Sequence, residues 1–284
     1  MVTDYFQNIL VAVDGSPYSL QAEELVANLA KSFSSKVTVL HVIPHEIKHP
    51  AREYLQIPSN IREELEGSFL QRGRQIVQEA GALFAQEGVT AETILEEFAD
   101  PAETILQVAE EKESDTLVLG NRGKSEIEDF ALGGVAEKVV RHADRPVLIV
   151  KKKTEFSKIL VAIDGSKHAQ EALKYAAQLA LKYRSQITLL NVAQTMLPHV
   201  KTETARKMGE RVMSEAEAQV ERVKTDKRVE FGHPARTILD FAKDRNYDII
   251  AVGSRGLNPI KRFFLGSVSD NVARHSQCSV LIVR

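Results

Sequence analysis

The order of apolar and polar positions predicts the same series of strands and helices twice along the chain. Short β-branched runs at 9–13 and 159–163 are typical of buried strands, and each leads into Asp-Gly-Ser. Apolar residues at helical spacing follow, and Ser16 or Ser166 is suited to cap the helix that it precedes. Strands and helices alternate to the end of each series, which predicts a mostly parallel sheet covered on both faces.

The later elements also recur in one order. They are a second strand (37–42; 187–192), a long charged helix (about 68–87; about 202–224), a third strand, a helix opened by Pro101 or Pro234, a fourth strand (116–119; 249–252), a glycine loop, a last helix and a fifth strand. Ligands of such sheets bind beyond the carboxyl ends of the strands. We therefore expect function at Asp14 or Asp164 and at the two glycine loops.

The repeat is also visible residue by residue. FQNILVAVDGS matches FSKILVAIDGS at an offset of 150, whereas DTLVLGNRG matches DIIAVGSRG at an offset of 133. The first copy therefore has 17 extra residues, within about 44–67, between its second and third strands. We predict two α/β domains, residues 1–152 and 153–284, each a doubly wound, five-stranded parallel sheet of Rossmann-like type.

The glycine loop of the second copy has the spacing of a phosphate-binding loop. It consists of Gly253 and Gly256, then nine residues, then Gly266 and Ser267 at the start of the last helix. Glycine lets the backbone approach a phosphate closely, and a helix N-terminus offers free N–H groups to an anion. Alternatively, the glycines only form turns and Ser267 is only a helix cap. The complete spacing, between a buried strand and a helix, favours the phosphate site.

The first copy has Gly120, Gly123 and Gly133, but Gly134 stands where the second copy has the serine hydroxyl. Its loop contains Glu126, Glu128 and Asp129, whereas the loop of the second copy has Lys261 and Arg262 in this stretch. Residues 1–150 carry 13 Lys and Arg against 25 Asp and Glu, a net charge of −12, and residues 151–284 carry 24 against 14, a net charge of +10. We predict a weaker or absent nucleotide site in the first copy. The charge split could equally reflect drift of solvated surfaces, and a short helix could turn the acidic side chains to solvent.

Asp14 and Asp164 each stand at the end of a first strand. A carboxylate there can accept hydrogen bonds from ribose hydroxyls or help to hold a metal ion. The alternative is a turn residue that caps the next helix.

Five blocks occur in order in the chain: LVAxDGS, VTVLHV, PAETIL, LVLGNRGxS and LGGVAEKVVRHADRPVLIV. Together they resemble the universal stress protein family, and because both copies carry them, the chain resembles the tandem type. The resemblance implies a fold similar to that of the adenine nucleotide alpha hydrolases. It also implies ATP binding through the pattern G-x2-G-x9-G-S/T, with Mg held by the bound ATP and Asp164.

The resemblance further implies which residues hold the nucleotide. In the second copy they are Ala162, Ile163, Asp164, Val192, Gly253, Arg255, Gly256, Gly266, Ser267 and Val268. The weaker first-copy candidates are Asp14, Val42, Gly120, Gly123 and Gly133. Last strands pair edge to edge in the family, so Val147–Val150 and Val280–Val283 could pair within one chain, and a homodimer is expected.

Other classes of function find less support in the sequence. The single cysteine, Cys278, cannot form a disulfide within the chain, which fits a reducing compartment and a buried core position. The N-terminus does not resemble a signal peptide and no apolar run approaches the roughly 18 residues of a membrane span, so we expect the cytoplasm. Gly123-Lys124-Ser125 is not a P-loop, because Val118 occupies the position of its first glycine.

Two clusters are better explained as structural. His41, His45 and His49 share a spacing of four that could bind metal on one helix, but Pro44 breaks such a helix. The basic stretch from Lys201 to Arg211 is typical of a solvated helix face rather than of a nucleic-acid site.

The sequence thus predicts a cytoplasmic stress-response module that binds ATP, mainly in the second copy. Phosphoryl transfer needs a group that orients the nucleophile. The sequence pattern offers no residue that would serve as this catalytic base. Two alternatives remain open: slow ATP hydrolysis with Ser267 and Arg255 near the phosphates, and a scaffold that acts through protein partners with both sites empty.

Overall fold

The computed structural model describes residues 5–45, 58–123, 132–193, 202–220, 223–256 and 265–284. Packing divides these residues into two units. Unit 1 holds residues 5–45, 58–123 and Gly133–Val139, and unit 2 holds Leu132 and the described part of Val140–Arg284. The domain boundary expected between residues 152 and 153 follows the repeat rather than the packing, and it stays a prediction.

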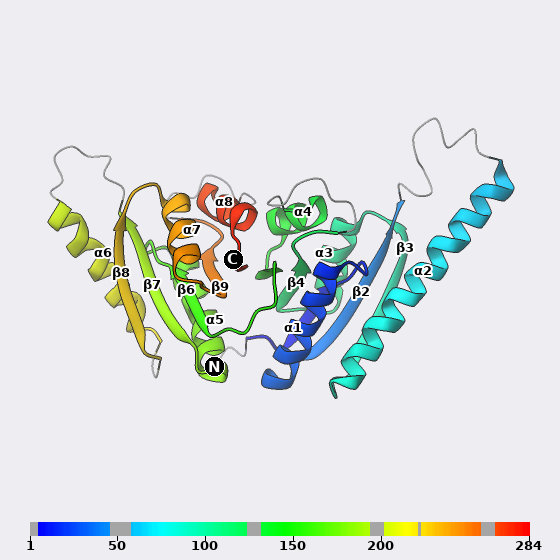
Figure 1. Ribbon diagram of the computed structural model, residues 1–284, viewed down its shortest axis with the longest axis horizontal. Helices are drawn as coiled ribbons and strands as arrows, with labels where there is room; N and C mark the ends of the chain where they lie inside the picture. The colour runs from blue at the N-terminus through cyan, green and yellow to red at the C-terminus, as the bar shows by residue number, and fades with distance from the viewer. Residues whose placement is uncertain (1–4, 46–57, 124–131, 194–201, 221–222, 257–264) are drawn as a thin grey trace. The chain divides into compact units, whose positions relative to one another are not determined.

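Unit 1 is a parallel sheet with helices packed on it (Figure 1). In chain order its elements are β1 (Asn8–Ala12), α1 (Pro17–Phe33), β2 (Lys36–Pro44), α2 (Ser59–Gln86), β3 (Ala91–Ala99), α3 (Pro101–Glu111), β4 (Thr116–Gly120) and the start of α4 (Gly134–His142). The strands lie in the order β3-β2-β1-β4, and every neighbouring pair is parallel.

Unit 2 repeats this arrangement and adds one strand from the first copy. Its elements are β5 (Val147–Val150), β6 (Lys158–Ala162), α5 (Lys167–Tyr183), β7 (Gln186–Ala193), α6 (Thr202–Glu217), β8 (Thr225–Phe231), α7 (Pro234–Asp244), β9 (Ile249–Gly253), α8 (Ser267–His275) and β10 (Ser279–Val283). The order is β5-β10-β9-β6-β7-β8, parallel throughout except for the pair of β5 with β10.

The central strands are apolar on both faces because helices cover both sides of each sheet. Ile9, Leu10 and Val11 of β1 are fully buried, and β9 and β10 are likewise buried almost along their whole length. This pattern is characteristic of parallel α/β sheets. The fold class expected from the sequence, two copies of a doubly wound α/β domain, is confirmed.

The predicted helix starts are also confirmed. The hydroxyl of Ser16 accepts a hydrogen bond from the N–H of Ser19 at the start of α1. Ser166 does the same for Ala169 at the start of α5. Proline opens α3 and α7, where its missing N–H costs nothing.

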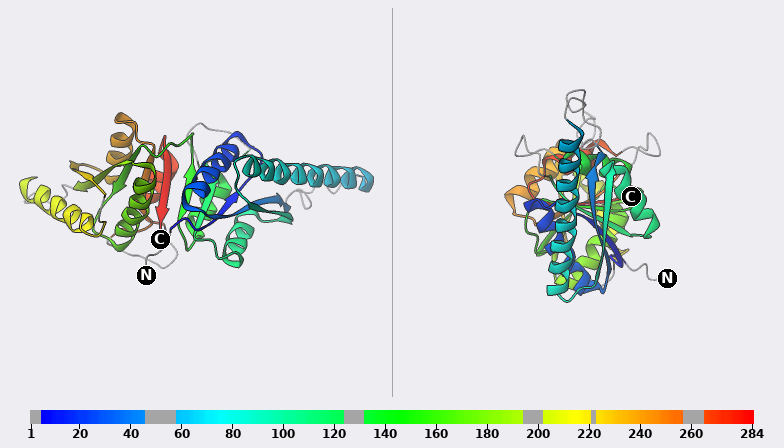
Figure 2. Two further views of the ribbon diagram at one scale, coloured as in Figure 1. Left: turned by 90° about the horizontal axis from the view of Figure 1, so that it is seen from below. Right: turned by 90° about the vertical axis from the view of Figure 1, so that its right-hand side faces the viewer.

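The long helix of the first copy begins earlier than expected. α2 starts at Ser59, not near Ser68, so some of the extra residues of the first copy are helical. Ile61, in this added part, is 43% exposed, Phe69 just after it is 38% exposed, and the buried face begins only at Gly73. Figure 2 shows α2 continuing past β3. A pattern of buried positions could not predict a helical stretch that buries little.

The long helix of the second copy is shorter than expected, because it ends at Glu217 rather than near Lys224. The carboxylate of Glu217 accepts hydrogen bonds from Thr225 and from Lys227, the latter at 2.6 Å, and both belong to β8. These contacts fix the reversal of the chain between α6 and β8, which the helical periodicity alone does not reveal.

The last strand of the first copy lies in unit 2. All four residues of β5 are buried, and β5 pairs antiparallel with β10, with Ile149 opposite Val280 and Val147 opposite Ile282. This is the strand pair that the family resemblance implies. The pairing of the two complete domains stays a prediction.

Two minor expectations can be compared with the structure. Cys278 is buried, as expected for a core residue, and burial raises the pKa of its thiol. Among the helices of the described segments, none combines the length and apolar composition of a membrane span.

Candidate functional site

The aspartate at the end of β6 is held next to the glycine loop of the second copy. Oδ1 of Asp164 accepts a hydrogen bond of 2.9 Å from the N–H of Ser166, across a turn in which Gly165 has a φ of +89°. Its other oxygen faces Gly256, since a Cβ placed on that glycine would lie 2.8 Å from Oδ2. Asp164 is thus both a turn residue and a neighbour of the loop, and its side chain is exposed.

Gly253 is required for a different reason from the one that the sequence suggests. A Cβ there would lie 2.6 Å from the N of Ala169 and 2.7 Å from the carbonyl carbon of His168. The loop therefore passes directly against the first turn of α5, and only a glycine fits. Among the described residues, Gly253, Gly256 and Gly266 do not have a positive φ.

Two backbone hydrogen bonds close the loop at its base. The N–H of Ser254 donates to the carbonyl of Val283 at 2.7 Å, and the N–H of Gly266 donates to the carbonyl of Ser254 at 2.7 Å. The ends of the loop are thereby fixed to β10 and to each other. Lys261 and Arg262 lie outside the described residues.

The start of α8 is open to an anion. Gly266 is the N-cap residue and provides no side-chain cap, and Ser267 is exposed at the first helical position. Ser269 anchors this turn, because its hydroxyl donates to the carbonyl of Gly253 at 2.5 Å. An uncapped helix N-terminus presents free N–H groups and a partial positive charge.

The expected nucleoside side of the site lies at the ends of β6 and β7. Ala162 and Val192 are half-buried and Ile163 is buried. The side-chain amide of Asn191 donates to the carbonyl of Ile163 at 2.7 Å and so ties the two strand ends together. Val192 lies at this same edge of the sheet, in register with Glu230 of β8.

The surroundings of this loop are cationic. Arg255 and Val268 are half-buried, and the carbonyl of Arg255 accepts a hydrogen bond of 3.2 Å from the hydroxyl of Ser166. Burial lowers the pKa of His168, and the positive charges of Arg255 and Arg284 lower it further. An anion bound here would relieve this repulsion between like charges.

The first copy builds the same framework. Oδ1 of Asp14 accepts from the N–H of Ser16 at 3.0 Å, a Cβ on Gly123 would lie 2.6 Å from Oδ2 of Asp14, and the N–H of Gly133 donates to the carbonyl of Asn121 at 2.9 Å. A Cβ on Gly120 would lie 2.8 Å from the backbone of Tyr18. The candidate residues are therefore brought together in both copies.

The two frameworks differ in their side chains. Gly134 is exposed at the start of α4, where Ser267 starts α8, and Ala136 replaces Ser269. Val42 is buried, whereas its counterpart Val192 is half-buried. The acidic residues Glu126, Glu128 and Asp129 lie outside the described residues, as does His49.

The sequence pattern did not identify three residues of the second-copy site: His168, Asn191 and Ser269. Each one acts through a contact with another segment, at Gly253 or at Ile163. The repeat itself offered one signal, since Ser269 aligns with Ala136 of the first copy.

The two clusters interpreted as structural have structural contacts. His41 forms a hydrogen bond of 2.7 Å with the carbonyl of Val13. On α6 the basic side chains of Lys207 and Arg211 are exposed and pair with Glu203 and Glu215 of the same helix. Within the described ranges, no group of three His, Cys, Asp or Glu side chains is placed to hold a metal ion.

Comparison with known proteins decides the family. The sequence profile of the universal stress protein family matches residues 6–151 and again residues 155–284. The chain belongs to the universal stress protein family.

Similar proteins include members of both tandem and single-domain length. A universal stress protein of Mycolicibacterium smegmatis is 27% identical over 99% of this chain and 98% of its own length. The universal stress protein YxiE of Bacillus subtilis is 33% identical over 51% of this chain and 99% of its own length. A universal stress protein structure from Archaeoglobus fulgidus has a TM-score of 0.72 and 26% identity, and the alignment covers 98% of each chain. The present chain is therefore similar over its whole length to tandem universal stress proteins.

Proposed function

We propose that this universal stress protein binds ATP together with a divalent cation, mainly in the second copy, as a cytoplasmic stress-response module. The observation that carries the proposal is the uncapped start of α8, with exposed Ser267, beside the anchored ends of the glycine loop and Asp164. Membership of the family supports the same interpretation of the G-x2-G-x9-G-S pattern.

The residues of the second copy fit the parts of such a ligand. The N–H groups at the start of α8 and the hydroxyl of Ser267 would bind phosphate, and the strand ends at Ile163 and Val192 would lie beside the base. Mg, when bound with ATP, neutralises phosphate charge. It is usually held by one or two carboxylates together with the phosphates. Asp164, exposed and adjacent to the loop, would supply such a carboxylate.

The test is to denature the purified protein, analyse any released nucleotide, and titrate the nucleotide-free protein with ATP and Mg. We expect binding, with Ser267→Ala weakening it about tenfold, because a hydrogen bond to a charged group is lost. Gly134→Ala is the matched control, since a Cβ there meets nothing within 4 Å. The absence of both released nucleotide and measurable ATP binding would contradict the proposal.

Equal losses from Ser267→Ala and from Gly134→Ala would contradict the assignment to the second copy. Unfolding by urea should be measured for both variants, so that a loss of affinity can be separated from a loss of folding.

A further inference from the structure

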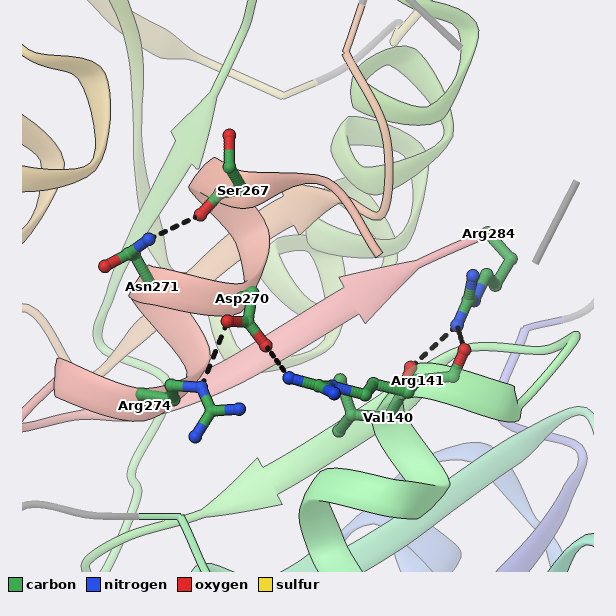
Figure 3. Close-up of polar contacts among 7 residues, drawn as sticks. All are labelled: Val140, Arg141, Ser267, Asp270, Asn271, Arg274 and Arg284. Carbon is green, nitrogen blue, oxygen red and sulfur yellow. Dashed lines mark hydrogen bonds and ion pairs between the residues drawn. The ribbon is translucent and has the colours of Figure 1, made fainter. Parts of the chain in front are cut away.

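The first turn of α8 contains an anion of its own. Asp270 lies three residues after Ser267, and its Oδ2 lies 3.0 Å from Nε of Arg274 (Figure 3). A carboxylate in the first turn is favoured by the positive end of the helix dipole. The same carboxylate repels a second anion that approaches this helix end. In Figure 3 the hydroxyl of Ser267 points away from the pair of Asp270 and Arg274.

A residue of the first copy reaches this carboxylate from the other side. Nη2 of Arg141, in the last turn of α4, lies 3.8 Å from Oδ1 of Asp270. Arg141 is 49% exposed and Asp270 is 26% exposed. Each carboxylate oxygen therefore faces one guanidinium group, one from each copy.

Arg284, which follows β10, holds the backbone of Arg141 in place. Nη2 of Arg284 donates to the carbonyls of Val140 and Arg141, at 2.6 and 2.9 Å. These carbonyls lie at the end of α4, where a cation is favoured. Arg284, Arg141, Asp270 and Arg274 thus form one continuous series of contacts (Figure 3).

A cation that follows β5 makes the reciprocal contact with the end of α8. Lys151, which follows β5 as Arg284 follows β10, donates from Nζ to the carbonyl of Arg274 at 3.0 Å, near the end of α8. Because β5 and β10 are antiparallel, the cation after each strand reaches the last turn of the helix that precedes the other strand. The strand pairing therefore places Arg284 at the end of α4, where Arg141 lies.

We propose that Arg141, contributed by the first copy, is a positioning residue that holds Asp270 and balances its charge, so that the start of α8 can bind phosphate. This inference rests on the proposed ATP site in the second copy. It makes the affinity of that site depend on a side chain from the domain that binds nucleotide weakly or not at all.

The test is a double-mutant cycle on Arg141→Gln and Asp270→Asn, read as the affinity for ATP and for tripolyphosphate at low salt. Arg141→Gln should weaken binding by about two- to fivefold, the range of an exposed ion pair. Asp270→Asn should strengthen binding, because the resident anion is gone. In the Asp270→Asn background, Arg141→Gln should have no further effect.

Lys138→Gln is the matched control, because Lys138 carries the same charge on the same helix but pairs with Asp100, at 3.3 Å. It should leave the affinity unchanged. Arg141→Lys should restore part of the affinity lost in Arg141→Gln. The loss of affinity with Arg141→Gln and the gain with Asp270→Asn should both shrink as salt is raised, since exposed charges are screened.

The outcomes separate this inference from the proposed function. If the wild-type protein binds neither ATP nor tripolyphosphate, the proposed function fails and the inference falls with it. If ATP binds but Arg141→Gln weakens binding equally in both backgrounds, or in neither, only the inference is overturned. A loss with Lys138→Gln as large as that with Arg141→Gln would overturn it as well.

Discussion

At the end of β4 and at the end of β9 the chain makes matching contacts. The bond from Gly133 to Asn121 corresponds to the bond from Gly266 to Ser254, and Asp14 faces Gly123 as Asp164 faces Gly256. What changes is the helix that follows, which starts with Gly134 in one copy and Ser267 in the other. A shared backbone framework therefore does not establish a shared function, because binding depends on the side chains that the framework presents.

The largest effect should come from the part that both copies share. Gly120→Ala and Gly253→Ala would each force a Cβ to within 3 Å of the backbone of the adjoining helix, α1 or α5. We expect each to destabilise its copy by about 3 kcal/mol, as strong overpacking does. Urea unfolding measures this, with Gly134→Ala as the neutral control. A clear difference between the two copies would show that their frameworks are not equivalent.

The next effect, a dependence of stability on pH, should appear in the first copy alone. Glu23 of α1 is only 6% exposed, and its counterpart in α5 is Leu173. Burial, opposed by a hydrogen bond from Ser19 and reinforced by the charges of Asp14, Glu79 and Glu24, raises its pKa from the usual 4.5 to about 7. The folded protein therefore holds a proton that the unfolded chain releases between these two values.

The stability associated with Glu23 is present below pH 4.5 and is lost as pH rises through about 7. The loss should be about 3–4 kcal/mol, roughly 1.4 kcal/mol for each unit of difference in pKa. Glu23→Gln should flatten this dependence and stabilise the protein at pH 8, as measured by urea unfolding across pH. Glu110→Gln, at an exposed position of α3 whose charge does not contribute to the pKa of Glu23, serves as the control. An unchanged pH profile in Glu23→Gln would contradict the prediction.

A smaller effect should separate the two serine caps. Ser16→Ala and Ser166→Ala should each cost about 1 kcal/mol of stability, the usual value of an N-cap. Ser166 also donates to the carbonyl of Arg255, within the proposed site. Ser16 donates likewise to the carbonyl of Arg122, but the proposed site is in the second copy, so only Ser166→Ala should weaken ATP binding as well. Calorimetric titration can measure this. Equal losses of affinity would mean that the first copy contributes to binding.

The smallest effect should follow from giving the first copy the missing hydroxyl. In a Ser267→Ala background, Gly134→Ser should raise ATP affinity by no more than about threefold, because one hydroxyl cannot offset an acidic surrounding. ATP titration of both variants decides this. If affinity returned to that of the wild type, the hydroxyl alone would account for the difference between the copies.

The parts that could be predicted from the sequence are those recorded in local patterns. Buried strands such as 9–13 are continuous apolar runs, Ser16 and Ser166 precede their helices, and Gly266 precedes Ser267 directly. The repeat then confirmed each element by showing it twice.

The parts that could not be predicted depend on contacts between distant segments. Ser269 matters because it meets Gly253, and Asp270 because it meets Arg141, 129 residues earlier in the chain. The end of α6 at Glu217 likewise depends on Thr225 and Lys227 of the next strand. Nothing in the local sequence of these residues distinguishes them from ordinary helix-surface positions.

The pairing of β5 with β10 also has a consequence for how the protein is made. β5 ends at Val150 and its partner ends at Val283, 133 residues later in the chain. At a synthesis rate of about 5–20 residues per second, β5 waits roughly 7–27 seconds for its partner to leave the ribosome. Throughout that interval an apolar strand has one unpaired edge, a feature that favours aggregation. Nascent chains that stall within the second copy should therefore be the forms most dependent on chaperones.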